Sequence, residues 1–205
     1  RNRKPHVVDR KTIRLWDADA GQALAMFRAH GTDVYSICLS DDGLLILSAG
    51  MDAVNWDWRY TVRLWATQTG ECLWEHVSDK SVHSVRMSPD SHLLLFGSGD
   101  ATVHVWDSDG RWGALGEALG GNNVGIHPVW PSPDGRTVIS GGMSYRTLRL
   151  GYVDTGALLR TFEGHDQSFQ TVCMSADGTL AFSGSTDNTI RLWDVDSGKP
   201  LATLE

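Results

Sequence analysis

Eight histidines and three cysteines are the side chains in this 205-residue chain best suited to ligate a metal or to act as nucleophiles and bases. The cysteines, Cys38, Cys72 and Cys173, are odd in number and form no C-x-x-C pair, which argues against a disulfide framework and against a zinc site. The histidines show no spacing typical of metal ligands. We therefore expect no metal site, and we expect the reducing conditions of the cytoplasm.

Other motifs for catalysis or cofactor binding are missing from the sequence. It contains no P-loop, no H-E-x-x-H and no pair of carboxylates at a convincing site. The glycine-rich stretch GNNVGIHP at 121–128 lacks the lysine and the following helix that phosphate binding would need. We therefore expect no cofactor.

Charge and hydropathy argue against two classes of partner. The formal net charge of −7 leaves no basic footprint, so we do not expect nucleic acid to be the main partner. The sequence also has no run of 18 or more apolar residues that could span a membrane. With 41% hydrophobic residues, 21% charged residues and 22 glycines, the composition is that of a folded chain with many turns, which favours an all-β fold.

A repeat organises the whole chain. Four serines occupy related contexts (CLSDDG, RMSPDS, WPSPDG and CMSADG) and lie 48, 44 and 43 residues apart, at Ser40, Ser88, Ser132 and Ser175. A second marker of the type TIRLWD recurs with the same period and is eroded to TLRLGY at 147–152. A period of this length indicates a repeat architecture in which each unit is one supersecondary element.

Each unit contains four short segments with the composition of strands, here named a to d. In the first complete unit they are VYSICLS, LLILSAG, TVRLWA and CLWEHV. Asp-Gly pairs between strands a and b supply a positive φ for a hairpin turn, and glycines between strands c and d do the same. Every unit is therefore predicted to be an antiparallel meander.

These repeats resemble the WD-repeat β-propellers, whose units of about 40 to 45 residues begin near GH and end in WD. The most faithful copy is GHDQSFQTVCMSADGTLAFSGSTDNTIRLWD at 164–194, and the resemblance covers nearly the whole chain. It implies a single all-β propeller region over 1–205, with a two-stranded half blade at 1–29 and four complete four-stranded antiparallel blades. The complete blades are expected at 30–77, 78–120, 121–163 and 164–205.

Four and a half blades are expected to leave an incomplete ring, because propellers close with about four to eight blades and the wedge of a WD blade suits about seven. Three outcomes stay open. The missing blades belong to the same parent chain, or copies of this chain assemble into a larger ring, or the eroded third unit lets a tight ring form. An open arc would expose apolar blade faces at both ends.

In the WD-repeat family a good blade carries a buried hydrogen-bonded tetrad of His, Ser, Asp and Trp. The resemblance implies such tetrads at His30, Ser48, Asp52 and Trp65 and at His165, Ser183, Asp187 and Trp193. The second unit keeps only Asp100 and Trp106, and the third keeps only Ser140. Two of the four units are therefore expected to lack most of this brace, and the sequence leaves open whether Asp52 or Asp57 faces the first histidine.

A serine, a histidine and an aspartate in one cluster could also form a nucleophilic triad. However, Ser48 and Ser183 lie inside apolar strand segments, with no nucleophile elbow and no glycine-lined oxyanion site beside them. A fully satisfied buried network instead fixes the register of a blade. We therefore expect the tetrads to be structural and the chain not to be an enzyme.

An insertion in the first unit carries aromatic residues that the repeat does not explain. The connection from strand b to strand c takes nine steps there, from Asp52 to Thr61, whereas the fourth unit takes two, so seven residues have been added. Aromatic and polar residues alternate within it, which is the period of a strand. We expect a hairpin with its turn near Ala53 to Asn55 that extends strand c and presents Trp56, Trp58 and Tyr60.

In WD-repeat proteins, partners commonly dock on the upper face, which is formed by the b–c and d–a loops, so the resemblance implies a protein or peptide partner there. The candidate partner-binding residues on this face are Trp56, Trp58, Arg59, Tyr60, Met143, Tyr145 and Arg146. Alternatively, the aromatic side chains of the insertion fold back onto a neighbouring blade.

We expect a non-catalytic interaction module, the WD-repeat portion of a larger scaffold or sensor protein. Two alternatives remain. The first is a self-assembling structural propeller whose exposed blade edges complete a larger ring. The second is an accessory domain of a kinase or NTPase whose chemistry lies outside this chain.

Overall fold

The described part of the chain consists of strands joined by turns and short loops. The computed structural model describes residues 10–54, 57–107, 112–115, 125–142 and 146–205. Within these ranges the chain forms one two-stranded sheet and four four-stranded sheets, all antiparallel. No helix of the length and apolar character needed to cross a membrane occurs in this described part.

The five sheets are called here the half blade and blades 1 to 4. The half blade contains β1 (Thr12–Trp16) and β2 (Ala23–Arg28). Blade 1 contains β3 (Val34–Leu39), β4 (Leu45–Val54), β5 (Asp57–Ala66) and β6 (Cys72–Ser78). Blade 2 contains β7 (Val82–Met87), β8 (Leu93–Ser98), β9 (Val103–Asp107) and β10 (Trp112–Leu115).

The second half of the chain repeats this arrangement. Blade 3 contains β11 (Ile126–Pro131), β12 (Thr137–Gly142), β13 (Thr147–Tyr152) and β14 (Leu158–Glu163). Blade 4 contains β15 (Phe169–Met174), β16 (Leu180–Ser185), β17 (Ile190–Asp194) and β18 (Pro200–Leu204). In every blade the four strands pair in chain order, so each blade is an antiparallel meander.

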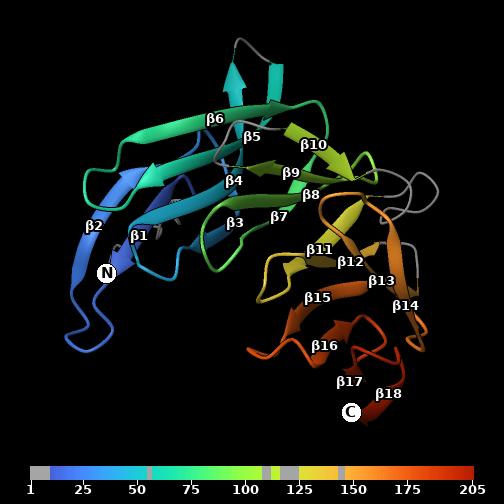
Figure 1. Cartoon of the computed structure of the whole chain (residues 1–205). Coiled ribbons are helices and arrows are strands. Elements are labelled where there is room, and N and C mark those ends of the chain that lie inside the picture. Colours follow the sequence, from blue (N-terminus) through green and yellow to red (C-terminus); the bar gives the residue numbers. More distant parts are fainter. Residues whose placement is uncertain (1–9, 55–56, 108–111, 116–124, 143–145) are drawn as a thin grey trace, which may run out of the picture.

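The blades follow one another along an arc, with the first strand of each blade on the inside (Figure 1). Strand β3 contacts β7, β7 contacts β11, and β11 contacts β15. The half blade lies at one end of the arc and blade 4 at the other (Figure 1). The predicted all-β propeller architecture, with four complete blades and a two-stranded half blade, is confirmed.

A serine–aspartate motif closes the first hairpin of every blade. In blade 1 the hydroxyl of Ser40 donates to Asp42 Oδ1 (2.6 Å), and Ser40 Oγ accepts from the amide of Leu45 (2.9 Å). Gly43 follows with a φ of 72°, which glycine adopts without steric cost. The same side-chain bond joins Ser88 to Asp90, Ser132 to Asp134 and Ser175 to Asp177. The four repeated serines of the sequence therefore fix these hairpins.

The hydrophobic core lies between neighbouring blades. Leu47 and Val62 of blade 1 pack in one buried cluster with Val85 of blade 2. Another cluster joins Phe162 of blade 3 to Trp193 of blade 4. Full burial of an apolar side chain of this size is worth about 1.5–3 kcal/mol, so each blade depends on its neighbour for stability.

The two ends of the arc expose faces that are buried inside it. Phe182 and Ile190 of blade 4 occupy the strand positions that Leu47 and Val62 occupy in blade 1. The blade 1 residues are 0% exposed, whereas Phe182 is 39% and Ile190 is 50% exposed. At the other end, Trp16 of the half blade is 54% exposed. The described residues thus form an open arc with an apolar face at each end.

We expect Gly50→Ala to lower the free energy of unfolding by about 3 kcal/mol, because blade 1 has no room for a side chain there. A Cβ at Gly50 would overlap the ring of His30 and lie 2.5 Å from the carbonyl oxygen of Asp33. Urea denaturation followed by tryptophan fluorescence measures the change. Gly43→Asn is the control. A Cβ added at Gly43 would have no atom within 4 Å apart from its chain neighbours, and Asn tolerates the positive φ of this residue. Equal losses in the two variants would contradict the prediction.

Candidate partner-binding site

In blade 4 a buried histidine ties the loop ahead of β15 to the two middle strands. His165 Nε2 lies 2.8 Å from Ser183 Oγ, and His165 Nδ1 lies 2.7 Å from Asp187 Oδ2. The indole N–H of Trp193 donates to Ser183 Oγ at 2.8 Å. Because the carboxylate of Asp187 only accepts, the imidazole N–H of His165 lies on Nδ1 and donates to Asp187, and Nε2 accepts the hydroxyl hydrogen of Ser183. Burial alone would raise the pKa of Asp187, but hydrogen bonds from Thr189 and His165 outweigh it and hold that pKa well below its usual range.

Blade 1 builds the same brace with one additional hydroxyl. His30 Nε2 lies 2.8 Å from Ser48 Oγ, which also accepts the indole N–H of Trp65 at 2.9 Å. On the other side of the ring, His30 Nδ1 lies 2.9 Å from Thr61 Oγ1. The hydroxyl of Thr61 donates to Asp52 Oδ2 at 2.8 Å. The aspartate therefore reaches the histidine through Thr61 instead of directly.

The insertion explains this difference between the two blades. In blade 1 strands β4 and β5 stay paired beyond the blade, so Asp52 sits in an extended ladder opposite Arg59. There it accepts a hydrogen bond from the amide of Gly31 and an ion pair from Arg63 Nη2 at 2.7 Å. Asp57 is exposed and lies 3.5 Å from Arg59. Asp52, and not Asp57, is thus the aspartate that serves His30.

The tetrad serines are not placed to act as nucleophiles. Ser48 is 0% exposed and Ser183 is 1% exposed. Each oxygen is occupied by a tryptophan N–H on one side and a histidine nitrogen on the other. A nucleophile must reach the atom that it attacks, and these hydroxyls cannot. The geometry makes both tetrads structural braces.

Blade 2 replaces the tetrad by stacked rings. Phe96 stands where the serine would be, and its ring stacks on His104 with centroids 4.7 Å apart. His104 Nε2 lies 3.1 Å from Asp100 Oδ2. Trp74, from blade 1, packs on Trp106 with centroids 4.8 Å apart. Aromatic side chains from the strands of blades 1 and 2 therefore fill the space where blade 2 lacks a tetrad.

The insertion of the first unit forms a two-stranded extension of blade 1. Strands β4 and β5 have 10 residues each and stay in register to the pair Val54 and Asp57. The extension rises beyond the neighbouring strands (Figure 1). Ala53 belongs to strand β4 and not to the turn expected near Ala53 to Asn55, and Asn55 lies outside the described residues. Trp58 is 60% exposed, and Arg59 beside it is also exposed.

One face of this extension continues into a cluster that we call the aromatic surface, formed by Tyr35, Met51, Trp58, Tyr60 and His83. Met51 lies opposite Tyr60 across the two strands. The hydroxyl of Tyr35 lies 3.6 Å from Met51 Sδ, and the rings of Tyr35 and His83 are 5.7 Å apart. The surface thus spans the tops of blades 1 and 2.

The structure also shows which candidate residues sequence reasoning missed. Tyr35, Met51 and His83 come from three different strands, and no pattern in the sequence places them beside the insertion. Pairing across β4 and β5 brings Met51 in, and packing of β3 on β7 brings His83 in.

Only some of the other predicted binding residues lie in the part of the chain that the structure describes. Trp56, Met143 and Tyr145 lie outside the described residues. Arg146 is exposed and lies immediately before β13, in blade 3. The described partner-binding candidates that share one extension are Trp58, Arg59 and Tyr60.

Repeated four-stranded antiparallel blades, two of them braced by buried tetrads, define the fold of a β-propeller. A family model described as "WD domain, G-beta repeat" matches residues 21–56, 70–107 and 156–194, more than half of the chain. The chain therefore belongs to the WD-repeat family, and the resemblance inferred from the sequence is confirmed. The unmatched stretch between 107 and 156 includes strands β11 to β13 of blade 3, where the marker motif is eroded.

One curated relative is WD repeat-containing protein 18 of Danio rerio. It is 27% identical over 213 residues, an alignment that covers 95% of this chain and 48% of that protein. The chain thus spans about half the length of this relative. Proteins with WD repeats are generally non-catalytic scaffolds for protein–protein interaction, which agrees with the buried position of the tetrad serines.

The stability of blade 1 is expected to fall in mild acid because His30 must stay neutral. Burial, together with the nearby Arg63 guanidinium, lowers the pKa of His30 to about 4. Histidine in an unfolded chain has a pKa near 6.5, so the unfolded state binds more protons between these two values and stability rises with pH there. We expect a loss of about 3 kcal/mol as the pH falls from about 6.5 to about 4.

The matched control is His30→Gln, which removes the titrating group. The difference in free energy of unfolding between the two proteins, measured by urea denaturation, should shrink as the pH is lowered through this range. His76, whose pKa burial and then His104 also lower, titrates in both proteins, so its contribution cancels. A difference that stays constant with pH would contradict the prediction.

Proposed function

We propose that this chain is a non-catalytic protein–protein interaction module and the WD-repeat portion of a larger scaffold or sensor protein. Its partner docks on the upper face, at the aromatic surface of blades 1 and 2. The exposure of Trp58 on a strand extension that the repeat does not need is the observation that carries this proposal.

The composition of the aromatic surface supports docking. Tyrosine, tryptophan, methionine and arginine are enriched in protein interfaces, and tryptophan, tyrosine and arginine dominate their hot spots. Trp58 and Tyr60 are held in register by the ladder of β4 and β5, so little backbone freedom is lost when a partner covers them. Arg59 lies on the opposite face of the extension, where it can contact the rim of the same partner.

The root of the extension is rigid, which also favours a binding role. Arg63 holds Asp52 at 2.7 Å, Glu75 at 2.6 Å and the carbonyl oxygen of Ala29 at 2.6 Å. This network fixes the base of the hairpin to β6 and to the loop before β3. A projection anchored in this way presents its side chains in a defined geometry.

The exposed ends of the arc support a second role, completion of a larger ring. Phe182 and Ile190 at one end and Trp16 at the other stand at positions that a neighbouring blade would cover. We place the missing blades in the rest of the same protein, with assembly of several copies as the alternative. The free thiols Cys38, Cys72 and Cys173 fit a protein of the cytoplasm.

Trp58→Ala is expected to weaken partner binding at least tenfold, because hot-spot tryptophans contribute about 2 kcal/mol or more. Stability should change by less than about 0.5 kcal/mol, since the side chain is exposed. Partners captured from cell extract by the wild-type chain would be identified and their affinities measured by calorimetry.

Trp16→Ala is the matched control for this experiment, because it removes a tryptophan of similar exposure at the end of the arc. Partners of the aromatic surface should be retained by that variant. A large loss of stability in Trp58→Ala with unchanged binding would show that the extension serves local packing.

Native mass spectrometry separates the two sources of missing blades. We expect a monomer of about 22.5 kDa, because we propose that further blades of the same protein cover the exposed ends of the arc. A monodisperse oligomer would instead establish assembly of copies.

A further inference from the structure

The repeat places four residues of three chemical types at equivalent positions inside the arc. Each lies two positions before a repeated serine, on the inner strand of its blade: Cys38, Arg86, Trp130 and Cys173. Because β3, β7, β11 and β15 lie next to one another, three of these residues, Cys38, Arg86 and Trp130, line a common space. The residue types at this position differ between blades, and they therefore determine which ligands the space can bind.

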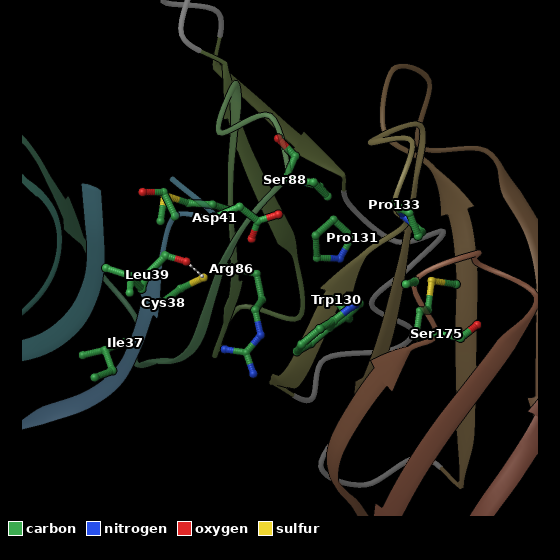
Figure 2. A pocket seen from close by; sticks show the side chains of 15 residues that line it. Ile37, Cys38, Leu39, Asp41, Arg86, Ser88, Trp130, Pro131, Pro133 and Ser175 are labelled. Atoms are coloured by element: carbon green, nitrogen blue, oxygen red, sulfur yellow. Dashed lines mark hydrogen bonds between the residues drawn. The ribbon is translucent and has the colours of Figure 1, made fainter. Parts of the chain in front are cut away.

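A cavity of about 620 Å³ lies there, at the end of the inner strands that carries the a–b turns. Its lining comes from all four complete blades, and its apolar part includes Leu39, Met87, Trp130 and Met174. A volume of this size is typical of sites for small ligands or peptide segments. Figure 2 shows Arg86 in the middle of this space, between Cys38 and Trp130.

The guanidinium of Arg86 has donors that the described residues do not use. It stacks over Trp130 at 4.7 Å from the ring centroid, and Nη1 donates to the carbonyl oxygen of Val85 at 2.8 Å. Its Nε atom is buried and has no hydrogen-bond partner in the described part of the chain. Arg86 also borders a second cavity of about 120 Å³ beside Ser36 and Gln170, so its side chain lines both cavities.

The charge of Arg86 reaches across the arc. Burial raises the pKa of Cys38 in blade 1 and of Cys173 in blade 4, and the positive charge of Arg86 opposes that rise at both thiols. Among the described residues that line the larger cavity, Arg86 is the cation and Asp41 is the carboxylate. Asp41 is exposed in the turn between β3 and β4, where water screens it, and no ion pair joins it to Arg86.

We infer that this cavity binds a carboxylate of an acidic peptide segment, with Arg86 as its anchor and Trp130 as the platform for a neighbouring apolar side chain. A guanidinium fixed by stacking on an indole presents parallel N–H groups that match a carboxylate. Leu39, Met87 and Met174 supply the apolar wall on which an aliphatic side chain of the segment packs. This site lies at the a–b turn end of the blades and is independent of the aromatic surface proposed for the main partner.

The test compares two fluorescein-labelled hexapeptides, one of alternating leucine and glutamate and one of alternating leucine and glutamine. Fluorescence anisotropy with the intact chain should show the acidic peptide binding at least tenfold more tightly than the neutral one. Arg86→Met, which keeps an apolar stem against Trp130 and removes the charge, should abolish that preference. Arg146→Met, which removes an exposed arginine from the upper face, is the matched control and should leave the preference intact.

Equal binding of the two peptides to the wild-type chain overturns the inference, as does an unchanged preference in Arg86→Met or no binding of the acidic peptide at 1 mM. Circular dichroism checks that Arg86→Met folds, and the comparison of peptides on the wild-type chain decides the matter if it does not. Binding of the main partner should survive Arg86→Met and weaken at least tenfold in Trp58→Ala, so the failure of either proposal is visible separately.

Discussion

Each blade with a complete tetrad depends on the hydrogen bonds made by the hydroxyl group of one buried serine. Ser48 and Ser183 each accept an indole N–H from strand c and lie within hydrogen-bond distance of a histidine that precedes strand a. One oxygen atom thereby joins two strands to the loop that leads into the blade. This loop lies on the upper face, so the buried tetrad determines its position. A fully satisfied buried network holds the loop in one arrangement.

Blade 2, which lacks this network, shows which interactions can replace it. In blade 2 the ring of Phe96 takes the place of the serine, and stacking on His104 takes the place of hydrogen bonds. Stacked rings bury apolar area but fix direction less strictly than a hydrogen-bonded chain does. Blade 1, next to it, carries the extension with Trp58, and its root at Asp52 is held by Arg63 and Thr61. The blade with the hydrogen-bonded tetrad thus carries the projecting surface, and the adjoining blade is held by stacked rings.

Much of the fold could be predicted from the sequence, because the signals involved act over few residues. The alternation of apolar and polar residues predicts strands, and the Asp-Gly pairs predict hairpins whose glycines do have positive φ, as at Gly43. The half blade and four complete blades followed from counting these elements against the period of the repeat. The tetrad positions followed from the resemblance to WD repeats, and the hydrogen bonds of His165 lie where that resemblance implied.

The sequence by itself therefore determined the blades, their order and the residues that brace them. Only the tertiary structure decided that Thr61 mediates between His30 and Asp52, that Trp58 projects instead of folding back, and that Arg86 meets Trp130 at the inside of the arc. The physical reason is distance along the chain. These outcomes depend on cross-strand register and on the packing of blades whose contacting residues are about one repeat apart, and local propensity carries no information about which side chains meet there.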